Sequence, residues 1–346
     1  MRGADAATLV HSLAIPLPTV SSVGVAGVTL GGASGYLSRK YGLTLDNLIA
    51  LDVVTADATE LRARDDENGE LFWAMRGAGA NFGVATALHY RLRPARPEML
   101  AGQIVYRFDE ARETLRFFRD FMRGAPDDFQ RYPFTFRVPP IDAFPAELHG
   151  EPVLDFVFCH GDPDAAAFVQ PLRELGEPIL DVVGPLPYTH IQQSFDASLP
   201  KGQRYYSKVH YLDDLSDAAI ETIAMHVPEM KGEFTAAYLE PLGGAMAEVE
   251  RAATAFPGRD ARYSFHILAG WMNSADDDAV MSWARGFHDA MRAHATGGVY
   301  VNFMPADEVD RVAKAYGPSY RRLAKAKRRF DPSNLFRMNQ NIQPSA

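Results

Sequence analysis

A glycine-rich stretch near the start of the chain restricts its folding more than any other feature. Residues 24–35 read Gly-Val-Ala-Gly-Val-Thr-Leu-Gly-Gly-Ala-Ser-Gly, so five of twelve residues are glycine among strand-forming residues. Glycine clusters of this kind mark positive φ or a close approach to the backbone. The stretch matches neither a P-loop nor a G-x-G-x-x-G fingerprint. Two interpretations remain: a loop whose amides cradle a flat or anionic cofactor, or a pair of glycine-rich β-turns.

Three further segments carry a family resemblance together with this stretch: Tyr36–Leu48, Leu71–Val84, which includes Arg-Gly-Ala-Gly-Ala-Asn-Phe-Gly, and Phe330–Ile342, which begins Phe-Asp-Pro-Ser-Asn. With them the chain resembles the FAD-linked oxidoreductases of the berberine bridge enzyme type, in the vanillyl-alcohol oxidase superfamily. The resemblance covers nearly the whole chain, including residues 202–208, 242–245 and 254–256. Each motif alone is weak, but their order and wide spacing make the signal strong.

The length and charge of the chain limit its partners. With 346 residues, 47% hydrophobic and 23% charged, the chain has enough material for about two domains with a sizeable core. The formal charge of −9 argues against nucleic acid as a partner. The basic run at residues 321–329 is predicted to be a solvated helix face. The family resemblance implies a small-molecule substrate as the partner.

The single cysteine and the absence of long apolar runs bear on location. Cys159 lies in an alternating strand pattern, and is predicted to fill the core rather than to act as a nucleophile. A lone cysteine fits a reducing compartment. The sequence contains no run of 18 apolar residues, so it predicts no membrane span, and its N-terminus is a poor signal peptide. The sequence therefore predicts a cytoplasmic protein with no membrane partner.

Periodicity and turn residues predict the elements of an α+β fold. The predicted helices are residues 4–13, 70–76, 111–123, 164–175, 217–227, 245–255, 276–295 and about 307–329. The predicted strands are residues 48–56, 60–64, 84–92, 154–159, 204–210, 235–239 and 263–269.

The resemblance implies how these elements are grouped. Residues 1–97 correspond to the second half of a PCMH-type FAD-binding domain. Residues 98–300 correspond to a substrate-binding domain, an antiparallel sheet with helices on one side. Residues 301–346 correspond to a segment that returns to the FAD-binding domain.

The resemblance also implies a set of cofactor-binding residues. These are Val23, Gly24, Val25, Gly27, Thr29, Gly31, Gly32, Asn81, Gly83, Val84, Asn339 and Asn341. The glycines would lie beneath the isoalloxazine and along the pyrophosphate, where backbone amides supply hydrogen bonds. Gly83 is equally compatible with a bulge before a strand, and the two asparagines with a surface tail. Val23 stands where a small side chain gives oxygen access to the flavin, which favours an oxidase over a strict dehydrogenase.

Two family features have no counterpart here. The cysteine that many relatives use to attach the flavin aligns with Val20, and the attaching histidine belongs to an upstream loop that this sequence does not contain. The first nucleotide-binding subdomain of the family would precede Met1. The expectations are therefore a fragment of a longer protein, a second chain that completes the FAD site, or weak or lost FAD binding.

The catalytic candidates follow from a short motif near the C-terminus. Tyr300-Val301-Asn302-Phe303 matches the Tyr-x-Asn-Tyr element of the family, so Tyr300 and Asn302 are the catalytic candidates. The second tyrosine often acts as the base, and Phe303 cannot accept a proton, so the base is not identified. Further candidates for the roof of the site are Tyr206, Lys208, His210 and Glu240, while His266 is predicted to pack rather than react.

The sequence thus predicts oxidation of a small organic substrate, such as an alcohol, a sugar or a natural-product intermediate, by bound FAD. A hydride would move to the flavin while a tyrosine assists removal of a proton. The main alternative is a non-catalytic fragment or partner subunit without stable flavin. A sugar-binding α/β module would explain the roof but not the glycine-rich stretch.

Overall fold

The computed structural model describes residues 1–338 and 340–346, so the predicted cofactor residue Asn339 lies outside the described residues. The chain divides into two compact units. Unit 1 consists of Met1–Ala95, Gly243–Asp260 and Gly297–Ala346, and unit 2 consists of Arg96–Leu242 and Ala261–Thr296. The sequence analysis divides the chain at 97/98 and 300/301, close to two of these breaks, but it assigns residues 243–260 to the middle domain.

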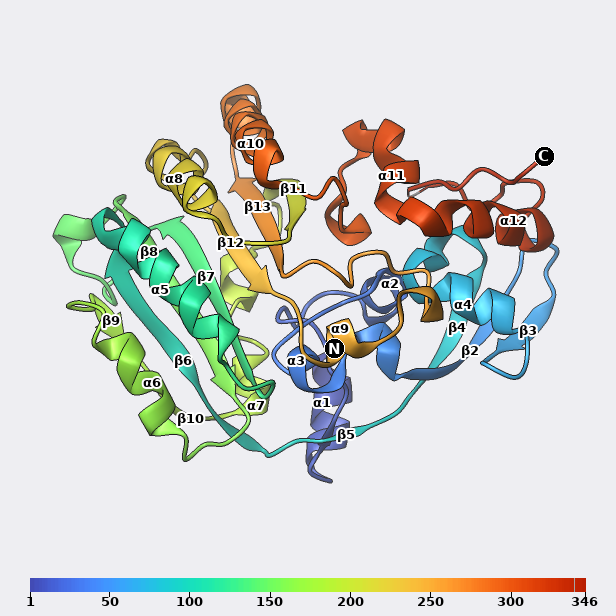
Figure 1. Ribbon diagram of the computed structural model, residues 1–346, viewed down its shortest axis with the longest axis horizontal. Helices are drawn as coiled ribbons and strands as arrows, with labels where there is room; N and C mark the ends of the chain where they lie inside the picture. Colours follow the sequence, from blue (N-terminus) through green and yellow to red (C-terminus); the bar gives the residue numbers. More distant parts are fainter. Residues whose placement is uncertain (339) are drawn as a thin grey trace. The chain divides into compact units, whose positions relative to one another are not determined.

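Unit 2 is built on an eight-stranded antiparallel sheet with the strand order β10-β6-β8-β7-β12-β13-β11, in which β9 pairs with the edge of β6 (Figure 1). The strands are β6 (Glu98–Arg107), β7 (Phe129–Arg137), β8 (Pro152–His160), β9 (Leu180–Asp181), β10 (Gly184–Pro187), β11 (Arg204–Leu212), β12 (Ala236–Pro241) and β13 (Tyr263–Trp271). Successive side chains of a strand point to opposite faces of the sheet, so every second residue, mostly apolar, points toward the helices. Cys159 on β8 is buried with its Sγ 3.5 Å from Met99 Sδ, which confirms its predicted place in the core.

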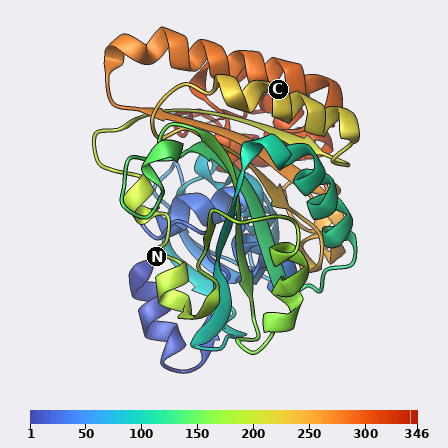
Figure 2. The ribbon, with the colours of Figure 1, turned by 90° about the vertical axis from the view of Figure 1, so that its left-hand side faces the viewer.

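Helices cover one face of this sheet, as Figure 2 shows for α5, α8 and α10. The helices of unit 2 are α5 (Ala111–Arg123), α6 (Ala166–Arg173), α7 (Tyr188–Ile191), α8 (Asp217–His226) and α10 (Asp277–Met291). Helix α5 buries Ala111, Leu115, Phe118 and Met122, which recur at helical spacing on one side. Helix α8 begins after Ser216, whose hydroxyl accepts a hydrogen bond from the Ala219 amide.

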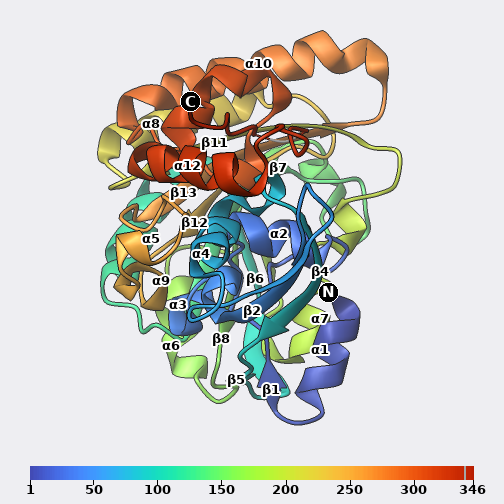
Figure 3. The same cartoon turned by 90° about the vertical axis from the view of Figure 1, so that its right-hand side faces the viewer.

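Unit 1 contains a small three-stranded sheet, β3-β2-β4, surrounded by short helices (Figure 3). Its strands are β1 (Leu13–Ala14), β2 (Leu48–Val54), β3 (Glu60–Ala63), β4 (Val84–Tyr90) and β5 (Arg93–Pro94). Its α-helices are α1 (Arg2–Leu9), α2 (Val25–Gly31), α3 (Ser38–Tyr41), α4 (Gly69–Ala78), α9 (Ala245–Glu248), α11 (Val312–Tyr316) and α12 (Tyr320–Phe330). Its 3-10 turns include η1 (Thr44–Asn47), η2 (Gly79–Asn81), η7 (Arg251–Ala253) and η10 (Val301–Phe303).

The segment Gly243–Asp260 is bound to helix α4 through backbone groups. The Trp73 indole donates to the Ala252 carbonyl at 2.9 Å, and the Ala255 amide donates to the Arg76 carbonyl at 3.0 Å. Gly77 has φ +130° and lies against this segment, where a β-carbon would be 2.8 Å from the Ala255 carbonyl carbon. Only glycine permits this approach.

Two predicted helices are wrong in extent. The helix expected at 245–255 ends at Glu248, because Val249 and Glu250 are extended before the short turn η7. The helix expected at about 307–329 is broken at Gly317, which has φ +50° and is followed by Pro318. Proline removes a backbone donor, so the chain forms α11 and α12 instead.

No helix within residues 1–338 and 340–346 is both long and apolar enough to cross a membrane.

Candidate functional site

The glycine-rich stretch forms a helix rather than the loop or pair of turns predicted from the sequence. Helix α2 begins after Gly24, which is extended, and it ends at Gly32, which has φ +139°. The residues between them include Val25, Ala26, Val28, Thr29 and Leu30, which tolerate helical φ/ψ when the helix packs against its neighbours. Helix α2 contacts α4, η2 and η10, all within unit 1.

Gly31 and Gly32 make room for side chains from distant parts of the chain. A β-carbon on Gly31 would collide with the Asn302 side-chain amide. A β-carbon on Gly32 would lie 2.8 Å from the Phe256 ring and 3.2 Å from the Tyr300 ring. Packing within the protein therefore accounts for both glycines, and their predicted contact with a cofactor stays a prediction.

Tyr300 and Asn302 meet helix α2 through hydrogen bonds. The Tyr300 hydroxyl accepts from the Ala33 amide at 2.8 Å and from Asn302 Nδ2 at 2.8 Å. Asn302 Nδ2 also donates to the Val28 carbonyl at 3.1 Å. Two N–H donors directed at one phenol oxygen favour a negative charge on that oxygen. The structure thus brings both catalytic candidates against the glycine-rich stretch, although 267 residues separate Ala33 from Tyr300.

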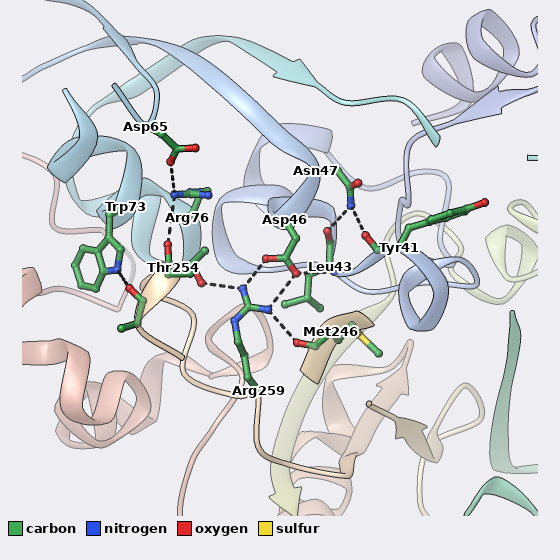
Figure 4. Close-up of polar contacts among 12 residues, drawn as sticks. Tyr41, Leu43, Asp46, Asn47, Asp65, Trp73, Arg76, Met246, Thr254 and Arg259 are labelled. Atoms are coloured by element: carbon green, nitrogen blue, oxygen red, sulfur yellow. Dashed lines mark hydrogen bonds and ion pairs between the residues drawn. The ribbon is translucent and has the colours of Figure 1, made fainter. Parts of the chain in front are cut away.

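A buried arginine that the sequence analysis missed, Arg259, lies close to Phe256 and is bonded to Asp46, Thr254 and the Met246 carbonyl, and Figure 4 shows these bonds. The Arg259 guanidinium bonds both Asp46 oxygens, at 2.5 and 3.1 Å, and it donates to the Thr254 hydroxyl at 2.9 Å. It lies 5.7 Å from the Phe256 ring centroid, and that ring meets Tyr300 edge-on at 6.0 Å. Asp46 and Arg259 are far apart in the sequence and belong to no common motif. The one sequence signal for this buried pair is a charged residue among apolar neighbours.

Two glycines at the start of α2 face open space. Gly24 precedes the helix and Gly27 lies in its first turn; both are exposed, and a β-carbon on either would meet no described atom within 4 Å. Val23 and Val25 beside them are half-buried. This surface without side chains fits a flat ring such as that of FAD.

Thr29, by contrast, points into the protein. It is fully buried, and its hydroxyl shares a 2.7 Å hydrogen bond with the Tyr90 hydroxyl. Burial raises the pKa of Tyr90 to about 12, and the Thr29 contact opposes this shift. The Thr29 side chain therefore has a structural partner.

The C-terminal tail is fastened to η2 by Asn81. Asn81 Oδ1 accepts from the Ile342 amide at 2.9 Å, and its Nδ2 donates to the Gln340 carbonyl at 3.3 Å. Between these two positions, the Asn341 Oδ1 atom is buried and has no partner among the described residues. A buried acceptor of this kind fits a donor supplied by a ligand.

Gly83 immediately precedes strand β4, which begins at Val84. A β-carbon on Gly83 would lie 2.7 Å from both Val53 Cγ1 and the Val54 carbonyl, which explains the glycine by strand packing. Val84 is 56% exposed. The predicted cofactor residues therefore divide: Gly24, Gly27, Asn341 and Val84 remain available, while the other glycines and two polar side chains serve packing.

Three of the four predicted roof residues lie on the wrong face of the unit 2 sheet. Tyr206, Lys208 and His210 alternate on the face covered by helices, where Arg285 of α10 donates to the Tyr206 hydroxyl and His288 stacks on His210 at 4.0 Å. Their prediction as roof residues is wrong, because the strand register turns them toward the helices. Glu240, the fourth, lies on the opposite face beside His266.

Two family models match the chain. The model "Berberine and berberine like" matches residues 299–343, and the model "FAD binding domain" matches residues 3–64. These regions contain the Tyr300 motif and helix α2. Among curated proteins, the chain is 30% identical over 347 residues to (R)-6-hydroxynicotine oxidase of Paenarthrobacter nicotinovorans, covering 93% of this chain and 71% of that protein.

Other relatives share the fold, and this chain spans about three quarters of their length. An FAD-linked oxidoreductase of Dictyostelium discoideum is 28% identical over 343 residues, covering 98% of this chain and 73% of that protein. The solved structure of 6-hydroxy-D-nicotine oxidase from Arthrobacter nicotinovorans superposes with a TM-score of 0.85 at 27% identity, covering 99% and 76% of the two chains. A chitooligosaccharide oxidase shares the fold, with a TM-score of 0.84 at 22% identity over 99% and 76% of the chains.

Proposed function

Because this chain belongs to the FAD-linked oxidoreductases of the berberine bridge enzyme-like family, we propose that it oxidises a small organic molecule at a carbon bearing a hydroxyl or an amine. FAD is the cofactor of this family, and it accepts the hydride when bound. The observation that carries the proposal is the hydrogen bond from the Ala33 amide, in the glycine-rich stretch, to the Tyr300 hydroxyl, which joins the two regions matched by the family models.

The proposal gives the residues of unit 1 separate tasks. Gly24 and Gly27 leave a surface without side chains on which the flat ring rests, and the Asn341 acceptor takes a donor from the cofactor. Asn302 orients the Tyr300 phenol. Residues 1–97 and 301–346 would bind FAD, and residues 98–300 would bind the substrate.

Tyr300 is proposed to accept the substrate proton in place of the absent second tyrosine. Its oxygen receives two N–H hydrogen bonds, from Ala33 and Asn302, and these stabilise the phenolate that a base requires. Phe303 packs 5.6 Å from the Tyr300 ring and has no group that titrates. A positioned base contributes roughly 10²- to 10⁴-fold to the rate.

The relatives indicate the range of substrates. One acts on a hydroxynicotine according to its name, and another, from Microdochium nivale, is called a carbohydrate oxidase. We infer an oxidase that passes electrons to oxygen and acts on an alcohol, a sugar or a natural-product intermediate. A cytoplasmic location is inferred as well, supported by the single buried cysteine.

The test begins with the purified protein and its flavin. FAD should be released by acid precipitation, since Val20 stands where relatives carry an attaching cysteine. The Tyr300→Phe variant should retain FAD and lose roughly 10²-fold or more in turnover. Tyr41→Phe is the matched control, because the Tyr41 hydroxyl donates to the exposed Pro94 carbonyl, in a bond that does not involve Tyr300. Unchanged turnover in Tyr300→Phe would contradict its role as base.

The same preparation tests whether a second chain or an upstream segment contributes to the FAD site. Titration of FAD into the 346-residue chain should give weak binding if such a contribution is needed, because the diphosphate requires several donors in a shielded site. Tight binding and ordinary turnover by this chain alone would contradict that prediction.

A further inference from the structure

Three aromatic rings lie in one row across the unit 2 sheet. Phe134 of β7 pairs directly with Tyr238 of β12, which pairs directly with His266 of β13. The Phe134 and Tyr238 ring centroids are 4.6 Å apart with 24° between the planes, and the Tyr238 and His266 centroids are 4.5 Å apart with 5°. Direct cross-strand partners point to the same face, so all three side chains share one surface.

This surface is the face that the helices of unit 2 leave uncovered. Ala237 and Leu239 of β12 belong to the core formed with α5, α8 and α10, as do Phe265 and Ile267 of β13. Because side chains alternate along a strand, Tyr238 and His266 point away from these helices. Phe134 and Tyr238 are only partly buried, and they could contact a ligand.

The stacking fixes what the row presents outward. Rings that stack between neighbouring strands, at about the 4.8 Å strand spacing, stand upright on the sheet. The Tyr238 ring is stacked on both faces, Phe195 packs on Phe134 with 5.0 Å between the ring centroids, and His266 is buried, so the row offers ring edges rather than open ring faces. An aromatic edge carries positive potential and attracts the negative π face of another ring. The row therefore favours a flat, electron-rich ring lying across the edges.

Buried carboxyl groups flank the row on the same face. Asp155 of β8 pairs directly with Phe134, is 3% exposed, and has an Oδ1 atom with no partner among the described residues. Burial raises the pKa of Asp155 well above its ordinary value. At the other end, Glu240 Oε2 lies 3.5 Å from His266 Nε2. A buried acceptor without a partner costs free energy that a donor from a ligand would recover.

We propose that the row Phe134–Tyr238–His266 binds a flat, electron-rich aromatic ring of the substrate, and that Asp155 receives an O–H or N–H group carried by that ring. This inference rests on the proposed function, because it names the class of substrate that the oxidase would accept. Within that class it favours aromatic alcohols and amines over sugars.

Calorimetric titration of the FAD-saturated protein, kept anaerobic with its flavin fully reduced, tests the inference without turnover, because a reduced flavin accepts no hydride from an alcohol. The probes are 2-naphthol, 6-cyano-2-naphthol, which has an electron-poor ring, and trans-2-decalol, which has the same skeleton without a π face. We expect 2-naphthol to bind best and trans-2-decalol about fivefold or more weakly, the ratio given by about 1 kcal/mol of edge-to-face attraction. Tyr238→Leu should remove this preference, and Tyr238→Phe should keep it.

The control variant is Tyr205→Leu, which makes the same substitution at a tyrosine outside the row that is 44% exposed. Phe134→Leu is a second variant with the expected loss, should Tyr238→Leu fail to fold. Asp155→Leu should weaken 2-naphthol but not 2-methoxynaphthalene, which has no donor. Equal binding of 2-naphthol and trans-2-decalol, or 2-naphthol binding that ignores Tyr238 and Phe134, would overturn the inference. A protein that still reduced its FAD with another substrate would then keep its proposed function.

Discussion

The two units are stabilised by different kinds of buried contact. Unit 2 has one large apolar core between its sheet and its helices, which includes Phe118, Phe156 and Trp271. Unit 1 is assembled from three segments of the chain, and buried polar groups join them. In unit 1, Arg259 reaches Asp46 across 213 residues, and Lys327 bonds Asp331 and the Asn81 carbonyl. Unit 1 also buries apolar residues such as Leu71 and Phe72, and in addition specific polar pairs join segments that are distant in its sequence.

Arg259 of unit 1 and Arg131 of unit 2 are both deeply buried, and the two differ in pairing. Arg259 of unit 1 bonds Asp46, Thr254 and the Met246 carbonyl. Arg131 of unit 2 is fully buried, and its three guanidinium nitrogens have no hydrogen-bond partner among the described residues. Removing one partner from a buried pair leaves an uncompensated charge, whereas replacing an unpaired charge leaves none. The two sites should therefore respond to substitution in opposite ways.

Arg259→Met should have the largest effect. It leaves the Asp46 carboxylate buried without its partner, a loss of about 3–5 kcal/mol in the free energy of unfolding. Hydrogen exchange measured by mass spectrometry should show faster exchange in residues 243–260 and 297–304, with unit 2 peptides unchanged. The double variant Asp46→Leu with Arg259→Met removes both charges and should recover part of the loss. Unaltered exchange in Arg259→Met would show that the pair does not hold unit 1 together.

Gly32→Val should follow, and Gly27→Val is its matched control. At Gly32 the positive φ and the contact with Phe256 together predict a loss of about 2–4 kcal/mol. At Gly27 a side chain meets no described atom, so the free energy of unfolding should change by less than about 1 kcal/mol. FAD affinity should nevertheless fall in Gly27→Val, because its side chain occupies the surface proposed for the ring. Equal FAD affinity in Gly27→Val and the wild type would remove this helix face from the cofactor site.

Acid should loosen the C-terminal tail at Asp331. Burial alone would raise the pKa of Asp331, but the hydrogen bonds from Lys327 and from the Leu335 and Phe336 amides lower it below its ordinary value. The stability that a lowered carboxylate pKa contributes is present above pH about 4 and is lost as the pH falls through the lowered pKa. Exchange in residues 331–337 should therefore increase below pH about 4, and Asp331→Asn should show the same increase already at neutral pH. No difference between Asp331→Asn and the wild type at neutral pH would contradict this.

The periodicity of the sequence predicted many helices and strands of unit 2. It did not predict the contacts that join distant segments in unit 1. The apolar spacing of α5 gave the observed bounds Ala111–Arg123, because that helix buries one regular face. Strands β6 and β7 escaped prediction, since β6 contains Gly102 with φ +144° and β7 contains Pro133 at its centre. From the local sequence, a glycine or proline predicts a turn. It stays in a strand here because the segment pairs with strands that are distant in the sequence.

The candidate site shows the same division. The glycine-rich stretch and Tyr300 were found by resemblance, but the sequence does not indicate that Gly31 and Gly32 admit Asn302, Phe256 and Tyr300. It also placed His210 on the roof, because strand register is not visible from composition. Local patterns predict elements, whereas the contacts that position a site depend on residues hundreds of positions apart.

The smallest expected change is at Arg131, and it separates the two arginines most clearly. The Arg131 guanidinium lies 3.6 Å from the Phe156 ring centroid and 5.3 Å from that of Phe118. Burial lowers the pKa of Arg131 well below its ordinary value, while the nearby Tyr106 opposes that shift. Cation–π attraction returns about 2 kcal/mol, less than the desolvation of an unpaired guanidinium requires.

Arg131→Met keeps most of the side-chain volume and removes the charge, so it should leave the free energy of unfolding unchanged or raise it by about 1 kcal/mol. The measurement is the thermal unfolding of Arg131→Met and of Arg259→Met, two variants that carry the same substitution in different units. A large loss of stability in Arg131→Met would mean that stacking on phenylalanine replaces an ion partner in this core. A gain would mean that unit 2 depends on its apolar area alone, because the charge at its centre then adds nothing to the packing around it.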